Sequence, residues 1–348
     1  MSRKKHLLKT FCLVAVILVL VSLTQREIDR FRQTTGAVGF QIYRELDLAS
    51  FAGTVLLAGF RGLAVNILWI RSINLMDRHD WFELSALYKL ISKLQPNFPS
   101  VWVFNSWNMS HNISVHWDSK EDKWRWFKAG IDFAKEGLQK NPDNPELLFW
   151  LGLLYYQRIY RYVDAEHPEH QPYFLRQVEE TEGQTAPEMA LKYFTRARDI
   201  GRHATFGPYV QDVNVAHAME AVAWGAFEKK NLEKAVTYME KASAEWKRLI
   251  PKYPHLPVLR SHYQEARRTA EWFSDENVPH ILDLYDATQE AYREQDYDRG
   301  IACMEEAARG WEELASKYPH AADDLRDRHQ RALNLIGVLR EVQEKSTP

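Results

Sequence analysis

Apolar side chains recur at spacings of three and four residues along much of the chain. In residues 145–157, Leu148, Leu151 and Tyr155 follow this spacing, with the small Gly152 between them. Such a stripe is typical of an α-helix that buries one face, and a glycine within it lets a neighbouring helix approach closely. The same period continues in other segments, so we predict an all-α chain.

Prolines mark where several of these helices begin and end. A proline at the first helical position loses nothing, because the N–H that it lacks would be unpaired there. We predict helices over Trp81 to Leu94, Pro99 to Trp117, Lys123 to Lys140, Pro145 to about Tyr162, and Met189 to Asp199. The charged residues 118–122 are predicted as a loop, and the polar, proline-containing residues 163–186 as an insertion.

Residues 7–23 form an apolar run near the lower length limit for a membrane-spanning helix. Basic residues at positions 3, 4, 5 and 9 exceed those of the mixed-charge flank at 25–32, so the positive bias places the N-terminus in the cytoplasm. The competing interpretation is a cleaved signal peptide, but the exit of the run lacks a small-x-small cleavage pattern. We therefore expect a transmembrane anchor, with the C-terminal part of the chain outside the cytoplasm.

A second apolar stretch, Leu48 to Ile70, carries Arg61 as its only charge. A second membrane span is one interpretation. Gly59 and Gly62 interrupt the run, however, and Arg61 would lie near the middle of the bilayer at a cost of several kcal/mol. Packing within the folded domain is therefore the favoured interpretation.

The last third of the chain contains an internal repeat. Residues 232–255 align without gaps on residues 297–320, and the match resumes beyond them with one extra residue. Identical pairs include Trp246 with Trp311, Lys252 with Lys317, Tyr253 with Tyr318, and His255 with His320. The unit is about 65 residues long, enough for three helices, and repetition of this kind indicates a solenoid.

Composition narrows the classes of function. The formal net charge of -2 gives no basic surplus for nucleic acid. Cys12 lies in the first apolar run and Cys303 is the only other cysteine, so neither an intramolecular disulfide nor a cysteine zinc site is expected. The 12 tryptophans need deep packing or a ligand, and we assign most of them to the core.

Residues 141–157 resemble the junction of two tetratricopeptide repeat (TPR) units. Pro142 ends one helix pair, Pro145 starts the next, and Leu151, Gly152 and Tyr155 match the Leu-Gly-x-x-Tyr motif of the family. The residues Ala190, Phe194 and Ala197 match its Ala-x-x-x-Phe-x-x-Ala spacing. The resemblance implies a TPR-like helical-repeat solenoid.

Residues 50–160 also resemble uncharacterised membrane-anchored bacterial TPR proteins, through the segments Phe60 to Arg71 and Leu94 to Met109. The predicted organisation follows from both resemblances together with the repeat. It comprises a cytoplasmic tail 1–6, the anchor 7–23, a linker 24–47, TPR-like units over 48–204 with an insertion at 163–186, two long repeats over 205–343, and a tail 344–348.

In the TPR family, ligands contact fixed positions of the first helix of each unit. The resemblance carries these positions onto two helices of this chain, and the residues there are largely apolar and aromatic. The predicted partner-binding groove consists of Val103, Phe104, Trp107, His111, Phe149, Trp150, Leu153, Tyr156 and Gln157. An apolar groove suits an amphipathic helix or an extended apolar segment. The alternative is that the chain fills its own groove, with residues 48–70 or 163–186.

Three sets of polar residues are candidates for a metal, catalytic or ligand site. His167 and His170 with Asp164, Glu166 and Glu169 suggest a metal, but Pro168 prevents a helical i,i+4 ligand pair, so no metal site is predicted. His255 and His320 recur at the register of the repeat and are predicted to be turn residues. The residues Asn105, Asn108 and Asn112 lie at i, i+3 and i+7 and indicate either a buried hydrogen-bond network or a ligand surface.

No phosphate loop, nucleophile elbow or His-Glu-x-x-His helix occurs, so neither an enzyme nor a cofactor is predicted. The leading hypothesis is a membrane-anchored scaffold for protein–protein interaction in a bacterial envelope complex. The alternative is a polysaccharide-binding or export-associated module, because exposed tryptophans stack on glycan rings. A metal-dependent enzyme ranks third.

Overall fold

The computed structural model describes residues 61–201 and 207–346, and this part of the chain is helical without any β-strand. The predicted all-α class is therefore confirmed. Within these residues no helix is both long enough and apolar enough to cross a membrane. The predicted anchor at 7–23 and residues 48–60 of the second apolar stretch lie outside the described residues.

The chain divides into two compact units, residues 1–101 and 102–348. In the first unit α3 (Arg61–Asp77) packs against α4 (Trp81–Leu94). Asp80 caps α4 by accepting the N–H of Glu83, and Leu84, Tyr88 and Ile91 are fully buried as the apolar spacing predicts. Helix α5 (Pro99–Trp107) begins just before the boundary and continues into the second unit.

Two helices of the second unit change their winding partway along. Helix α5 runs into the π-helix η1 (Asn108–Ile113) and the 3₁₀ turn η2 (Ser114–His116). Helix α7 (Pro145–Leu153) runs into a second π-helix, η3 (Leu154–Tyr160). Both stretches are helical over nearly the predicted residues. The change from α-helix to π-helix within each of them was not predicted. Single π-helical turns are rare and occur frequently at functional sites.

Between and beyond these two lie α6 (Lys120–Lys140), α8 (His170–Glu182) and α9 (Ala186–Ile200). Ser119 caps α6, so this helix begins inside the predicted loop. Helix α8 occupies the predicted insertion, where Phe174 and Val178 are fully buried in the core formed by α6, α7, η3 and α9. The insertion is therefore a packed helix with a short turn before it.

Two glycines fix how closely these helices approach one another. A Cβ added to Gly152 would lie 2.5 Å from the ring of Phe194 in α9, and one added to Gly137 would lie 2.6 Å from Trp102. No side chain larger than hydrogen fits at such a separation without displacing a buried ring. The predicted role of Gly152, close approach of a neighbouring helix, is confirmed.

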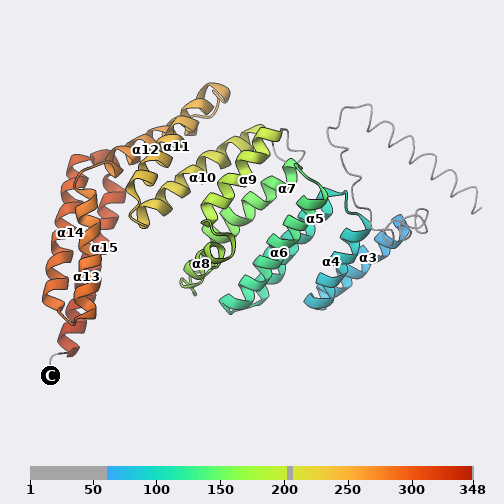
Figure 1. Cartoon of the computed structure of the whole chain (residues 1–348), viewed down its shortest axis with the longest axis horizontal. Coiled ribbons are helices and arrows are strands. Elements are labelled where there is room, and N and C mark those ends of the chain that lie inside the picture. The colour runs from blue at the N-terminus through green and yellow to red at the C-terminus, as the bar shows by residue number, and fades with distance from the viewer. Residues whose placement is uncertain (1–60, 202–206, 347–348) are drawn as a thin grey trace, which may run out of the picture. The chain divides into compact units, whose positions relative to one another are not determined.

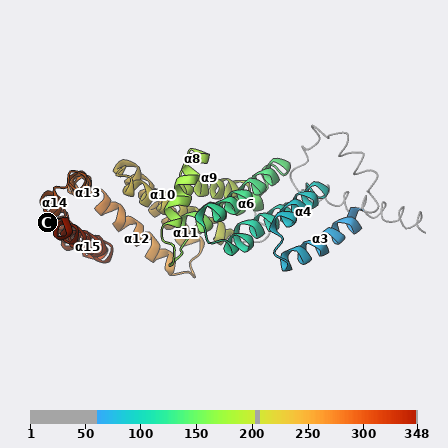
Figure 2. The ribbon, with the colours of Figure 1, turned by 90° about the horizontal axis from the view of Figure 1, so that it is seen from below.

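The remaining helices form two sets of three. The first set is α10 (Pro208–Glu228), α11 (Leu232–Lys252) and α12 (Val258–Phe273), and the second is α13 (Val278–Arg293), α14 (Tyr297–Lys317) and α15 (Ala322–Ser346). Helices α11 and α14, which carry the aligned repeat, are each 21 residues long. Figures 1 and 2 show α13, α14 and α15 side by side, and one hydrophobic core runs through both sets.

Candidate functional site

Three aromatic side chains from two helices meet in what we call the aromatic row: Trp107, His111 and Trp150. The ring centroids of Trp107 and His111 are 5.7 Å apart and nearly parallel, and those of His111 and Trp150 are 6.0 Å apart. The indole N–H of Trp150 donates to the hydroxyl of Ser106 at 3.3 Å. The row therefore joins α5 and η1 to α7, and it brings together three of the residues predicted to bind a partner.

Four more of the predicted residues extend the row at helical spacing. Val103 and Phe104 lie one turn before Trp107, and Leu153 and Gln157 follow Trp150 on its side of the second helix. Phe104 is 46% exposed, Gln157 is exposed, and Val103 and Leu153 are partly buried. We call these four residues together with the aromatic row the aromatic face.

Phe149 and Tyr156, the other two predicted contacts, belong to the core. Phe149 is fully buried, Tyr156 is 7% exposed, and both rings pack on Phe194 of α9, at centroid distances of 5.2 and 6.3 Å. The reason is that Phe149, Gly152 and Tyr156 form one stripe at i, i+3 and i+7, and α9 covers this stripe by approaching Gly152. These two side chains offer no surface to a partner.

Behind the aromatic row lies a stripe of buried serines, Ser106, Ser110 and Ser114. The hydroxyl of Ser106 donates to the backbone carbonyl of Gly130 in α6 at 2.8 Å, and that of Ser110 donates to the carbonyl of Ser106 at 2.9 Å. Arg158 of η3 reaches across to this stripe. Its Nε donates to the carbonyl of Ser110 and a terminal nitrogen to the hydroxyl of Ser114, both at 2.7 Å. The two π-helical segments are thus connected through one arginine.

Arg158 carries a positive charge that forms no ion pair with a carboxylate of the described residues. Its partners in the described part of the chain are neutral: the two serines, and the rings of Phe127 and Tyr162, which lie 4.7 and 5.7 Å from the guanidinium carbon. Burial lowers the pKa of Arg158, but an arginine with such an environment stays protonated at neutral pH. The site therefore holds a partly buried cation behind an uncharged aromatic surface.

His111 is the titratable member of the aromatic row. Burial, and next the charge of Arg158, lower the pKa of His111 to about 4, although a backbone hydrogen bond at Trp107 acts in the opposite direction. Its Nδ1 lies 2.9 Å from the hydroxyl of Ser110. At neutral pH the imidazole is uncharged, so the aromatic row presents apolar rings and adds no charge to that of Arg158.

Two of the three asparagines form a local hydrogen-bond network. The amide of Asn112 donates to the side-chain oxygen of Asn108 at 2.7 Å, and Asn108 donates to the carbonyl of Phe104 at 3.1 Å. Asn105 is fully buried, and neither its Nδ2 nor its Oδ1 has a hydrogen-bond partner among the described residues. A local network is thus present for two of the three residues, and it supports η1.

A second polar cluster lies in the turn before α8, where the sequence predicts no metal site. The imidazoles of His167 and His170 stack with centroids 4.6 Å apart and an interplanar angle of 12°. Glu169 contributes a carboxylate to the same place, and His170 is buried with 3% of its surface exposed.

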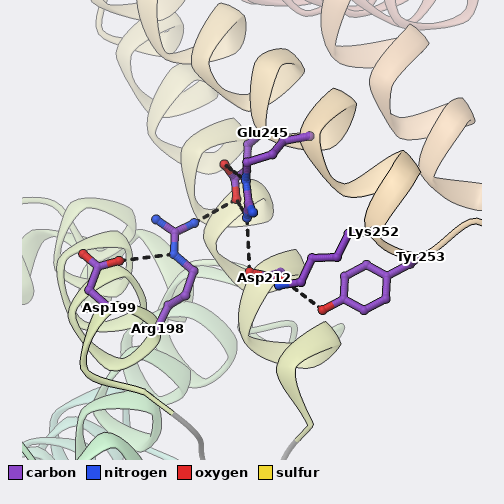
Figure 3. A network of polar contacts seen from close by, with 7 residues as sticks. Arg198, Asp199, Asp212, Glu245, Lys252 and Tyr253 are labelled. Carbon is purple, nitrogen blue, oxygen red and sulfur yellow. Dashed lines mark hydrogen bonds and ion pairs between the residues drawn. The ribbon is translucent and has the colours of Figure 1, made fainter.

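The repeated Lys-Tyr pairs at the ends of α11 and α14 each bind a buried aspartate. Asp212, whose side chain is 3% exposed, accepts from Lys252 at 2.5 Å and from the hydroxyl of Tyr253 at 2.8 Å (Figure 3). In the second repeat Asp275 accepts from Lys317 at 2.6 Å and from Tyr318 at 2.9 Å. We call these two arrangements the aspartate clamps.

Figure 3 also shows how the first aspartate clamp is connected to α9. Glu245 of α11 accepts from Arg198 of α9 at 2.8 Å, and Arg198 lies beside Asp199. Arg248 donates to both Glu245 and Asp212, at 2.6 and 3.2 Å. Cations and carboxylates are matched here within the protein, so this network is assigned to the fold.

The histidines of the Lys-Tyr-Pro-His motifs lie in the turns after α11 and α14. His255 is exposed, and His320 has an exposed side-chain fraction of 26% with its Nε2 3.7 Å from a carboxylate oxygen of Glu271. These positions agree with the predicted turn role. Arg158 and the serine stripe were not predicted as site residues. The i, i+4, i+8 spacing of the serines and the charge of Arg158 in a segment rich in tyrosine are the sequence signals that point to them.

Comparison with known proteins does not identify a family for this chain. No protein-family model matches the chain, and no curated protein matches it in a sequence search. The functional argument therefore depends on the residues and contacts of the chain itself.

Proposed function

We propose that this chain is a membrane-anchored, TPR-like scaffold that binds a protein partner on the aromatic face. In this proposal residues 7–23 anchor it in the cell membrane of a bacterium, the helices lie outside the cytoplasm, and the partner belongs to an envelope complex. The protein has no catalytic role. The observation that carries the proposal is the aromatic row with the uncompensated charge of Arg158 behind it.

The chemistry of this surface supports a protein segment as the ligand. Tryptophan and arginine are the residue types most enriched among those that dominate binding energy at protein interfaces. The aromatic face offers Trp107 and Trp150 from two helices, and both are partly buried and held in place by neighbours. Rings that are already ordered lose little conformational entropy when a partner covers them.

The charge of Arg158 specifies the partner further. A carboxylate brought next to a partly buried guanidinium that has no other counterion is attracted more strongly than one at an exposed arginine. We therefore infer a partner with an amphipathic or extended apolar segment that carries one acidic side chain. A glycan ligand is less favoured, because stacking on a sugar needs an open ring face and Trp107 is already stacked on His111.

The possibility that the chain fills its own groove has two forms. Residues 163–186 contain α8, which buries Phe174 against the rings of Phe127 and Trp124, at centroid distances of 4.9 and 6.5 Å. This segment therefore has a packing site of its own. Residues 48–60 lie outside the described part of the chain. Whether they or a partner cover the aromatic face is tested by the crosslinking experiment below.

Site-specific crosslinking tests the proposal. A photo-reactive amino acid placed at the exposed Gln157 should crosslink to a partner protein in native membranes, whereas the same group at Tyr292 on α13, which is 50% exposed, should not. Combining Trp107→Ala with Trp150→Ala should lower the crosslinked partner at least tenfold, since each such anchor contributes about 2 kcal/mol or more. The midpoint of thermal unfolding should fall by only a few degrees.

Two results would count against this function. A crosslink from Gln157 to residues 48–60 of the same chain would mean that the aromatic face is covered internally. An unchanged crosslink combined with a large fall in thermal stability would mean that Trp107 and Trp150 serve only the core.

A further inference from the structure

The turn that leads into α8 gathers four side chains with metal-binding chemistry: Asp164, His167, Glu169 and His170. One ligand atom from each of His167, Glu169 and His170 can be chosen so that all three lie within 4.8 Å of one another. The Oε1 of Glu169 is 3.4 Å from the Nδ1 of His167 and 3.7 Å from the Nε2 of His170. Ligand atoms around a tetrahedral zinc ion, at bond lengths of about 2.0 to 2.1 Å, are about 3.4 Å apart.

His170 is the unusual member of this cluster. It is 3% exposed, and its Nδ1 is buried without a hydrogen-bond partner in the described part of the chain. The Oδ2 of Asp164 lies 3.6 Å from that nitrogen, which is just too long for a hydrogen bond. A buried imidazole left in this state is uncommon in folded proteins, where buried polar atoms are normally satisfied.

Asp164 is fixed in a position suited to support His170. One of its oxygens accepts the backbone N–H groups of Glu166 and His167, at 3.2 and 3.3 Å, and the other accepts the hydroxyl of Tyr162 at 3.0 Å. In zinc sites the ring nitrogen that does not bind the metal commonly donates to a carboxylate of this kind. A small movement of His170 would place its Nδ1–H on Asp164 and its Nε2 toward Glu169.

We propose that His167, Glu169 and His170 bind a divalent transition-metal ion of the zinc class, with Asp164 orienting His170. Two imidazoles and one carboxylate are a common ligand set for zinc. In the sequence, Pro168 excludes an i,i+4 ligand pair on a helix, and for this reason no metal site is predicted there. Here Pro168 sets a turn that places His167 before α8 and His170 in its first turn, so their rings come together at i,i+3.

The expected consequence of the ion is structural. It would tie the turn at 161–169 to the start of α8, the helix whose Phe174 fills the core between α6 and η3. Lys123, 3.7 Å from Asp164, offsets only part of the negative charge of Asp164 and Glu169, and a dication would offset the rest. This site shares no residue with the aromatic face, although Tyr162, which donates to Asp164, also lies beside Arg158.

Metal titration of the purified full-length chain in detergent tests this site. After chelator treatment and dialysis, zinc chloride alone should bind with a stoichiometry of one in calorimetry and should raise the temperature of unfolding. Cobalt(II) should give the visible absorption of a tetrahedral site, which zinc then removes. His167→Ala and Glu169→Gln change exposed side chains, so they should fold normally and weaken zinc binding at least tenfold.

His255→Ala is the matched control, because it removes an exposed histidine from a turn elsewhere in the chain. Its zinc affinity should equal that of the wild type. The proposal is overturned if the wild-type chain shows no saturable zinc binding, if His167→Ala and Glu169→Gln bind as well as the wild type, or if His255→Ala weakens binding as much as they do.

Discussion

Arg158 in η3 and Arg328 in α15 are both partly buried arginines that lie over aromatic rings, but they differ in their counterions. Arg328 donates to Glu228 at 2.9 Å and lies 4.6 to 5.8 Å from the rings of Trp224, Phe227, Trp272 and Trp311. Arg158 has aromatic neighbours and neutral oxygen acceptors without any carboxylate in the described part of the chain. Arg328 therefore has a counterion within the protein, whereas Arg158 has none among the described residues.

The same difference separates the two parts of the second unit more generally. In α10–α15 several polar contacts occur twice. The buried Trp246 donates to Glu220 at 2.7 Å, and its counterpart Trp311 donates to Tyr285 at 3.1 Å. The Lys-Tyr pairs of the aspartate clamps also recur at the register of the repeat, whereas Asp212 lies inside α10 and Asp275 lies before α13. Repeats that stack on one another need the same contacts at the same positions of each repeat. We therefore infer that the repeated contacts stabilise the fold.

In α5–η3 the polar contacts occur once. The serine stripe, Arg158 and the aromatic row have no second copy, and they coincide with two π-helical segments. A contact that is unique and electrostatically incomplete is a better indicator of a binding surface than one that is repeated and satisfied. Experiments that disturb the two parts separately can test this distinction.

The largest effect is expected at the aspartate clamps. Asp212→Asn and Asp275→Asn should each lower the free energy of unfolding by about 2 to 3 kcal/mol, because each removes charged hydrogen bonds from a buried carboxylate. Denaturant unfolding followed by circular dichroism measures this. As a control, Glu179→Gln, which breaks an exposed ion pair with Lys229, should cost under about 0.5 kcal/mol. A loss as small as that of the control in either clamp variant would contradict the stabilising role of that clamp.

A smaller loss is expected where α9 approaches α7. Gly152→Ala places a methyl group against the fully buried ring of Phe194, and this overpacking should cost about 1 to 2 kcal/mol. The matched control is Gly225→Ala in α10, where a Cβ meets nothing within 4 Å. Because alanine favours a helix over glycine, this control should stabilise the protein by up to about 1 kcal/mol. If both variants lose stability equally, steric contact with α9 is not the cause.

The smallest effect is a pH dependence that differs between the two regions. The pKa of His111 is lowered to about 4 from 6.5, so the unfolded chain takes up a proton here before the folded protein does. Stability should therefore fall as the pH decreases from about 6.5 towards 4, and His111→Gln should remove its share of that fall. Thermal unfolding at a series of pH values measures it, and an unchanged profile in His111→Gln would argue against the burial of this ring.

The aspartate clamps should respond in a lower pH range. Burial by itself would raise the pKa of Asp212, but hydrogen bonds from Lys252 and Tyr253 outweigh burial and hold it below the ordinary value of 3.8. Asp275 behaves likewise with Lys317 and Tyr318. The stability from these carboxylates is present above about pH 3.8 and is lost as the pH falls through their folded pKa values. The pH therefore separates the contribution of the α5–η3 region from that of the clamps.

Features that depend on neighbouring residues in the chain were predictable from the sequence. The stripe at Leu84, Tyr88 and Ile91 indicated which face of α4 is buried, and the aligned repeat indicated that α11 and α14 would be equivalent. The role of Gly152 followed from its position in an apolar stripe. Helix formation, capping and periodicity are local, so a linear sequence contains them.

Tertiary structure decided which faces meet. Extending an α-helical period past residues 108 and 154 could not anticipate that both stretches wind as π-helices, which changes the residues that share a face. Phe149 and Tyr156 pack on α9 because α8 and α9 return to this helix, and Arg158 reaches the serines because the two π-helical segments lie together. The pairing of His167 with His170 likewise depends on the turn around Pro168. By itself the sequence determined the all-α class, the position of several helices and the repeat. Packing between segments distant in the chain decided which polar and aromatic side chains form a site, because burial and charge compensation depend on neighbours in space.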